Sequence, residues 1–178
     1  MARHIVLLRG INVGGRNRIA MADLREALVG AGFEDVRTYL QSGNVLLVSD
    51  ASPAEVASDC ERQVASRFGL DIQVVVRTRD ELADVVGRDP LGAFAFDHKR
   101  YQVSFLSAEL GADVVQKLGT LAVAPERFVA VGREIYSWHP GGIGRSRLWA
   151  RLASKSLGVT ATARNWTTVR NLLALTDQ

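Results

Sequence analysis

This sequence has little cysteine, little histidine and no long apolar run. Each of these features, where abundant, would point to an enzyme class or a secreted protein. Cys60 is the only cysteine among 178 residues, so an internal disulfide is excluded, and its position on an apolar helical stripe predicts a core residue. The three histidines, His4, His98 and His139, lie far apart in the chain. Because no pair of His, Cys, Asp or Glu has the spacing of metal ligands, we predict neither a metal site nor a cofactor.

The chain also has no apolar run approaching the roughly 20 residues that a bilayer span requires. Its first apolar run, residues 5–8, is too short for a signal peptide and is typical of a strand, so we expect a cytoplasmic protein without a membrane partner. No nucleophile elbow, Ser/His/Asp or Cys/His pattern is visible, which leaves Asp97, His98 and His139 as acid–base candidates. The net charge of +3 and the isoelectric point of about 9.4 are compatible with an anionic partner.

The hydrophobic pattern predicts an α+β fold, a tandem duplication of two ferredoxin-like halves. Each half follows the order βαββαβ and adds a further helix. We place the first half at residues 1–88, a connecting segment at 89–99 and the second half at 100–178. Strands are expected at residues 5–11, 36–41, 45–48, 72–77, 101–106, 127–131, 135–138 and 159–162, with helices between them that include residues 146–157.

Local signals mark where several helices begin. Ser52-Pro53-Ala54-Glu55 combines a capping serine, a proline in the first helical position and a glutamate that can reach back to the cap. Thr78-Arg79-Asp80-Glu81 repeats the capping-box pattern, and Asn165 is suited to cap the last helix. These signals predict helix starts near residues 53, 79 and 166.

Two short glycine-led turns and one aperiodic segment connect the remaining elements. Gly43-Asn44 fits a two-residue hairpin turn of type II′, in which the first position needs a positive φ. Gly132-Arg133 repeats the glycine-first pattern in the second half. In the connecting segment, Phe94 and Phe96 are expected to pin the loop onto the core.

Alternation along the strands gives each predicted sheet one apolar face and one mixed face. The mixed faces carry Arg37, Tyr39 and Gln41 in the first half, and Tyr136 and Trp138 in the second. Such a face either packs against the other half or forms a homodimer with a second subunit. Alternatively, it is a platform on which the bases of single-stranded nucleic acid stack.

A loop rich in glycine and arginine follows the first strand. Residues 10–15 have the spacing of the phosphate-binding loop G-x-x-x-x-G-K-[ST], but Arg16 replaces its lysine and Asn17 replaces its hydroxyl, which argues against nucleoside triphosphate hydrolysis. A weaker prediction remains, because successive amides such as those of Gly14 and Gly15 can form an anion nest. Three arginines add positive charge: Arg9, Arg16 and Arg18. The alternative is a flexible loop whose glycines only make the turn.

Three separated motifs carry a family resemblance. The segment Leu8-Arg9-Gly10-Ile11-Asn12-Val13-Gly14-Gly15-Arg16-Asn17 comes first, Tyr39-Leu40-Gln41-Ser42-Gly43-Asn44-Val45 second, and residues 146–169 third. In this order they resemble the signatures of the domain-of-unknown-function family numbered 1697. The sequence departs from that pattern where Arg16 and Arg147 stand in place of lysine and Thr167 in place of asparagine. The resemblance implies an α/β fold of two similar halves and carries no assigned activity.

These observations lead to a hypothesis that the protein binds an anionic, phosphate-bearing ligand, either a nucleotide or single-stranded nucleic acid. The predicted ligand-binding residues are Arg9, Asn12, Gly14, Gly15, Arg16, Gln41, Ser42, Asn44, Lys155, Arg164 and Asn165. Arg164 lies directly before a predicted helix start, where a helix favours negative charge. Two alternatives remain open: a cofactor-independent enzyme acting on a small anionic metabolite, and a dimerising interaction module.

Overall fold

A computed structural model describes all 178 residues of the chain. The chain divides into two compact units, the first formed by Met1–Ala83 with Leu172–Gln178 and the second by Asp84–Asn171. Each unit contains one four-stranded antiparallel sheet. The fold is therefore α+β with two such sheets, consistent with two ferredoxin-like halves, as the sequence predicted. None of its helices has the length and apolar character needed to cross a membrane.

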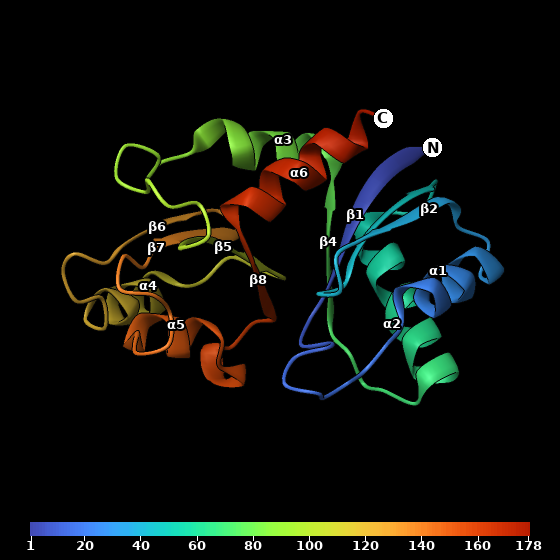
Figure 1. The fold of residues 1–178 in the computed structure, drawn as a ribbon, viewed down its shortest axis with the longest axis horizontal. Helices are drawn as coiled ribbons and strands as arrows, with labels where there is room; N and C mark the ends of the chain where they lie inside the picture. Colours follow the sequence, from blue (N-terminus) through green and yellow to red (C-terminus); the bar gives the residue numbers. More distant parts are fainter. The chain divides into compact units, whose positions relative to one another are not determined.

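The first sheet has the strand order β2-β3-β1-β4, and α1 and α2 lie on one of its faces (Figure 1). Its strand β1 pairs antiparallel with both β3 and β4, so it occupies the centre of the sheet. The elements are β1 (Ala2–Leu8), α1 (Met21–Gly30), β2 (Glu34–Tyr39), β3 (Asn44–Ser49), α2 (Pro53–Phe68), β4 (Val74–Thr78) and α3 (Arg79–Arg88).

The second sheet has the equivalent order, β6-β7-β5-β8. Its central strand β5 pairs antiparallel with β7 and β8, just as β1 pairs with β3 and β4. The elements are β5 (Tyr101–Leu106), α4 (Ala112–Gly119), β6 (Arg127–Val131), β7 (Glu134–Trp138), α5 (Arg147–Leu152), the 3₁₀ helix η1 (Lys155–Leu157), β8 (Ala161–Asn165) and α6 (Trp166–Thr176). Equal strand order and equal direction of pairing support an internal duplication.

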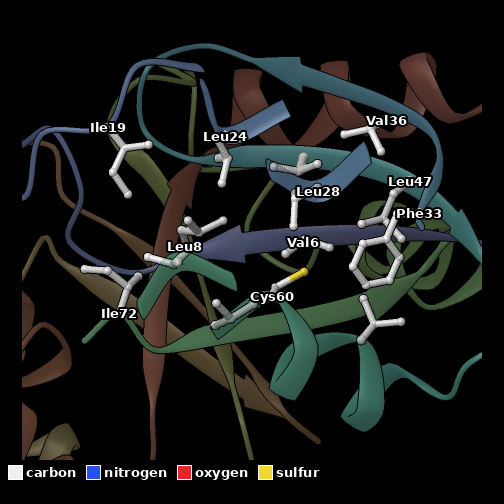
Figure 2. Packing of buried hydrophobic residues seen from close by; sticks show 14 of the residues in the cluster. Val6, Leu8, Ile19, Leu24, Leu28, Phe33, Val36, Leu47, Cys60 and Ile72 are labelled. Carbon is white, nitrogen blue, oxygen red and sulfur yellow. The ribbon is translucent and has the colours of Figure 1, made fainter. Parts of the chain in front are cut away.

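The core of the first unit lies between the sheet and its two helices. Side chains from β1, β3 and β4 meet the apolar stripes of α1 and α2, and Figure 2 shows the thiol of Cys60 among them. Cys60 is only 1% exposed, and burial raises the pKa of its thiol to about 12. The prediction that Cys60 is a core residue is confirmed.

The helix starts expected from local sequence are also confirmed. The Ser52 hydroxyl accepts from the Glu55 amide at 3.3 Å, and the Glu55 carboxylate accepts from the Ser52 amide at 2.8 Å. Thr78 and Glu81 form the same reciprocal pair before α3. At the start of α6 the Asn165 side-chain oxygen accepts from the Thr168 amide at 2.9 Å. These caps depend on residues three apart in the chain, which is why the sequence reveals them.

The first predicted hairpin turn is wrong in length. Because Tyr39 pairs with Asn44, four residues rather than two connect β2 and β3, and both Leu40 and Gly43 have positive φ. Asn44 itself belongs to β3. In the second unit, Val131 pairs with Glu134, so a two-residue turn is present there as predicted.

Two other expectations are corrected. The helix expected at residues 146–157 is interrupted, because α5 ends at Leu152 and the Ser154 hydroxyl caps the separate 3₁₀ turn η1. In the connecting segment, Leu91 and Ala95 are buried, whereas Phe94 is 44% and Phe96 87% exposed. The phenylalanines therefore do not pin this segment onto the core.

The sheet face on which base stacking was hypothesised is not open in the second unit. Tyr136 is fully buried and Trp138 is 3% exposed. The Tyr136 hydroxyl donates to the carbonyl of Val85 at 2.7 Å, and the Tyr101 and Trp166 rings stack at 4.7 Å. Because their surfaces are already covered, these aromatic residues cannot stack nucleobases.

Candidate functional site

The glycine-rich loop of the first unit folds into a miniature hairpin. Val13 and Arg16 form an isolated antiparallel bridge, and the Arg16 amide donates to the Val13 carbonyl at 3.0 Å. Gly14 and Gly15 occupy the turn with φ of +58° and +74°, the two positive values that a type I′ turn requires. Neither glycine amide is used by another protein group.

Asn12 ties this loop to the neighbouring β2–β3 hairpin. Its side-chain NH₂ donates to the carbonyls of Ile19 at 2.9 Å and Gln41 at 2.7 Å, and its side-chain oxygen accepts from the Ile19 amide at 2.8 Å. The side chain of Asn12 thus holds together two segments that sequence analysis had singled out separately. Its own polar atoms are occupied, so its role here is to position the site.

Gly43 explains why the two segments can approach so closely. Its carbonyl accepts from the Leu8 amide at 2.9 Å. A Cβ added to Gly43 would lie 2.8 Å from the Ile11 Cδ1 and 2.9 Å from the Leu8 Cβ, far inside van der Waals contact. Only glycine therefore lets the hairpin close against the end of β1 and the first residues of the loop.

The two segments border an open hollow of about 430 Å³. Its lining residues are Asn12, Gly15, Arg18, Ile19, Ala20 and Gln41. Helix α1 starts at this point, and its N-cap, Ala20, has no side-chain oxygen to accept from the first-turn amides. These amides have no partner within the helix and carry the positive end of its dipole.

Arg18 supplies the positive side chain of the hollow. Its guanidinium lies over the turn, with Nη2 3.4 Å from the position that a Cβ on Gly15 would take. No carboxylate or carbonyl of the protein pairs with it. Arg16 is exposed and likewise has no side-chain partner. The hollow therefore combines an available guanidinium with unused backbone amides.

The remaining predicted residues of the first unit play more structural parts. Arg9 is half-buried, and its amide donates to the Gln73 carbonyl at 2.9 Å. Asn44 is fully buried and donates to the Tyr39 carbonyl at 2.8 Å and to the Ser42 hydroxyl at 2.9 Å. Gln41 and Ser42 are exposed, but only Gln41 lines the hollow.

The predicted residues of the third motif all belong to the second unit. Lys155 is exposed on η1, Asn165 caps α6, and Arg164 is 7% exposed within β8. The Arg164 guanidinium donates to the Thr162 hydroxyl at 2.7 Å and to the Ala163 carbonyl at 2.8 Å. Burial lowers the pKa of this guanidinium to about 10. None of these residues lines the hollow of the first unit.

Arg164 has a counterpart in the first unit. Arg77 is 1% exposed and donates to the carbonyl of the preceding residue, Val76, at 3.1 Å, as Arg164 does to Ala163. Each arginine lies opposite the central strand of its sheet and directly precedes the capping residue of a helix. Arg77 and Arg164 therefore occupy equivalent positions in the two sheets, and Arg164 is part of the framework that the two units share. The two arginines lie far apart in the chain, so the sequence alone does not reveal that they are equivalent.

The structure also forms a Ser–His–Glu arrangement that spacing in the sequence did not reveal. His139 Nε2 lies 2.8 Å from the Ser137 hydroxyl, and Nδ1 lies 2.7 Å from a carboxylate oxygen of Glu126. Burial raises the pKa of the Glu126 carboxyl, but hydrogen bonds from Ser146 and His139 outweigh that effect and leave it below its ordinary value. Ser137 and His139 are fully buried, so no substrate reaches the hydroxyl. The network instead ties β7 to the start of α5.

No three side chains of His, Cys, Asp or Glu gather in a way that would hold a metal ion.

Sequence comparison gives the family. The model of the family described as "Protein of unknown function (DUF1697)" matches residues 1–136. The chain belongs to the DUF1697 family. No curated protein matches the sequence.

This DUF1697 protein resembles a solved structure over nearly its whole length. The conserved bacterial protein SP0830 from Streptococcus pneumoniae is 24% identical, with a TM-score of 0.79 and 98% of each chain covered. At that identity the likeness shows the fold alone. The residues matched by the DUF1697 model include both segments that border the hollow of the first unit, and they end before Lys155 and Arg164.

Proposed function

We propose that the first unit binds an anionic, phosphate-bearing ligand in the hollow at the start of α1. The observation that carries this proposal is the meeting of three kinds of donor around one open space. Arg18 provides an unpaired guanidinium, Gly15 belongs to a turn with unused amides, and Ala20 leaves the first turn of α1 uncapped. Each kind of donor favours negative charge, and phosphate accepts from all three.

The charge balance at the hollow is positive. Arg16 and Arg18 stand on the loop, and neither is neutralised by an ion pair. The one acidic residue in the first turn of α1 is Asp23, which is exposed. A helix N-terminus contributes only about 0.3–1 kcal/mol toward an exposed anion, so the guanidinium of Arg18 provides the main charge-assisted contact.

The size and lining of the hollow favour a ligand larger than free phosphate. About 430 Å³ falls within the range of small-molecule sites. Ile19 offers an apolar wall, and the exposed Gln41 side chain can donate and accept hydrogen bonds beside it. A nucleotide or another phosphorylated metabolite matches this combination of an anion-binding end and a mixed wall.

Titration calorimetry with inorganic phosphate, pyrophosphate and adenosine monophosphate tests the proposal. We expect measurable binding that tightens from phosphate to the larger ligands. Arg18→Gln should weaken binding at least tenfold, because it removes the charge and the forked donor while leaving no buried group unpaired. Arg62→Gln is the matched control, since Arg62 is exposed on α2 and pairs only with Asp59 on the same helix.

Asp23→Asn provides a second test, in which the affinity for anions should rise rather than fall. Removing this exposed negative charge from the first turn of α1 should strengthen binding of the same anions severalfold at low salt. If neither Arg18→Gln nor Asp23→Asn changes the affinity, the ligand binds elsewhere. If none of the three anions binds at low salt, the hollow is not an anion site.

A further inference from the structure

Two phenylalanines of the second unit are held at the surface. Phe96 is 87% exposed and Phe94 is 44% exposed, although both lie in a segment whose neighbours Leu91 and Ala95 are buried. Exposing aromatic rings costs hydrophobic free energy, and two of them close together in the chain form a distinct apolar feature.

Each ring nevertheless touches one side chain of the β6–β7 pair. The Phe96 ring meets Trp138 edge-on, with centroids 5.2 Å apart and an interplanar angle of 70°, and Trp138 is 3% exposed. The Arg127 guanidinium lies 3.8 Å from the centroid of the Phe94 ring. Arg127 and Trp138 are direct partners in the β6–β7 pairing. The four side chains therefore form one contiguous cluster, which we call the Phe96 platform.

Cationic side chains belong to the platform or lie close to it in the chain. Arg127 is part of the platform, and Lys99 and Arg100 follow Phe96 by three and four residues. Asp97 is the only acidic residue in residues 94–100, and its carboxylate lies 3.6 Å from the Arg100 Nε. Lys99 is exposed, and no carboxylate pairs with Lys99 or with Arg127. The surface thus combines an exposed ring, Phe96, with two cations that no carboxylate neutralises, Arg127 in the same cluster and Lys99 three residues along the chain.

We propose that the Phe96 platform binds single-stranded nucleic acid without regard to base sequence. A base stacks on the exposed face of Phe96, while Arg127 and Lys99 contact the flanking phosphates. Every base has a π-face, so stacking tolerates any sequence, and the cations track the backbone. An acidic peptide would pair with the cations but would bring no flat ring to stack on Phe96. A protein partner is disfavoured because two rings offer too little apolar area for a stable protein interface.

This site is independent of the hollow in the first unit. The hollow takes its donors from residues 12–20 and Gln41, whereas the platform uses residues 94–99 with Arg127 and Trp138. Variants of one should therefore leave the other unchanged. Arg18→Gln should retain oligonucleotide binding at the platform, and Phe96→Ala should retain anion binding at the hollow.

Fluorescence anisotropy with labelled single-stranded DNA and RNA of mixed sequence tests the inference on the full chain. Phe96→Ala should weaken binding about tenfold, equivalent to about 1.4 kcal/mol. Phe96→Leu should weaken it similarly, because leucine keeps the apolar contact with Trp138 but has no π-face. Val123→Ala is the matched control, since Val123 is a 62% exposed apolar residue of the same unit, and it should bind as the unaltered protein does.

Two further measurements separate stacking from charge. An abasic oligonucleotide keeps the phosphates but lacks bases, so it should bind about as weakly as a normal oligonucleotide binds Phe96→Ala. Arg127→Gln should lower the slope of log K against log salt by about 0.7, the effect of one phosphate contact on a single strand. The proposal is overturned if abasic and normal strands bind equally well, or if Phe96→Ala and Phe96→Leu bind as the unaltered protein does. It is also overturned if an acidic peptide displaces the labelled strand as effectively as an unlabelled oligonucleotide does.

Discussion

Replacing Ala20 by serine should stabilise the first unit and weaken anion binding at the same time. Ala20 is the N-cap of α1, and its carbonyl accepts from the Leu24 amide at 3.0 Å. It has no side-chain oxygen, so the first-turn amides stay available to a ligand. A serine hydroxyl would occupy one of these amides permanently. An anion in the hollow would then meet one donor fewer.

The size of the effect can be taken from two other helices of the same chain. Ala20 has φ of −69° and ψ of 133°, between the values of the serine caps Ser52 (−65°, 158°) and Ser146 (−80°, 117°). Those hydroxyls accept from the third helical amide at 3.3 Å and 3.0 Å. A serine at position 20 therefore reaches the Asp23 amide without a change of backbone. The gain should be about 1 kcal/mol in the free energy of unfolding.

Thermal unfolding and calorimetry measure the two halves of this prediction. Ala20→Ser should raise the Tm by about 2–4 °C and weaken phosphate or pyrophosphate binding severalfold, and Ala20→Asp should abolish binding because its carboxylate takes the place of the anion. Ser52→Ala is the control: it should lower stability by a similar amount and leave anion affinity unchanged. A stabilised Ala20→Asp variant that binds anions as before would refute the assignment of the α1 N-terminus to the site.

Three further predictions concern packing, pH and reactivity. Gly43→Ala should destabilise the protein by about 3 kcal/mol in urea unfolding, because its Cβ would collide with Ile11, whereas Gly132→Ala should cost only about 1 kcal/mol, since nothing lies within 4 Å of the added atom. The pKa of Glu126 lies below its ordinary value of 4.5, so its carboxylate stabilises the folded state at neutral pH. That contribution is lost as the pH falls through the folded-state pKa. In Glu126→Gln, the free energy of unfolding should therefore fall less steeply as the pH is lowered. Cys60, whose thiol pKa burial raises to about 12, should react with a thiol reagent only at the rate of unfolding, and fast labelling in native buffer would contradict its burial.

The sequence predicted the fold best where the signal was local or periodic. The capping boxes at Ser52 and Thr78 and the Asn165 cap involve atoms three residues apart, so a short segment contains the whole interaction. The interruption between α5 and η1 was missed because Ser154 was interpreted as part of a longer helix rather than as a cap. The length of the β2–β3 turn was missed because Leu40 takes a positive φ that its side chain disfavours.

The candidate site was predictable only in part, because its contacts join distant segments. The donors of the loop were visible from Gly14, Gly15 and the arginines beside them. Its bond to the hairpin through Asn12 and the Gln41 carbonyl spans 29 residues and has no signature in either segment. The Ser137–His139–Glu126 network depends in the same way on β6 and β7 being neighbours in the sheet. Composition and spacing cannot reveal such contacts.

The two units share a framework but differ in the loop that follows the central strand. The carbonyl of Gly43 accepts from the Leu8 amide at 2.9 Å, and the carbonyl of Arg133 accepts from the Leu106 amide at the same distance, so the two strand ends are equivalent. In the first unit residues 9–20 follow, and Ile11 fills the space beside Gly43.

In the second unit only residues 107–111 separate β5 from α4. A hollow of about 320 Å³ lies beside this short loop, bordered by Leu106, Glu109, Gly132 and Ile135. The longer loop of the first unit therefore adds Arg16, Arg18 and the unused amides of Gly14 and Gly15 after the end of β1. The anion site that we propose for the first unit therefore depends on residues that the shorter loop of the second unit lacks.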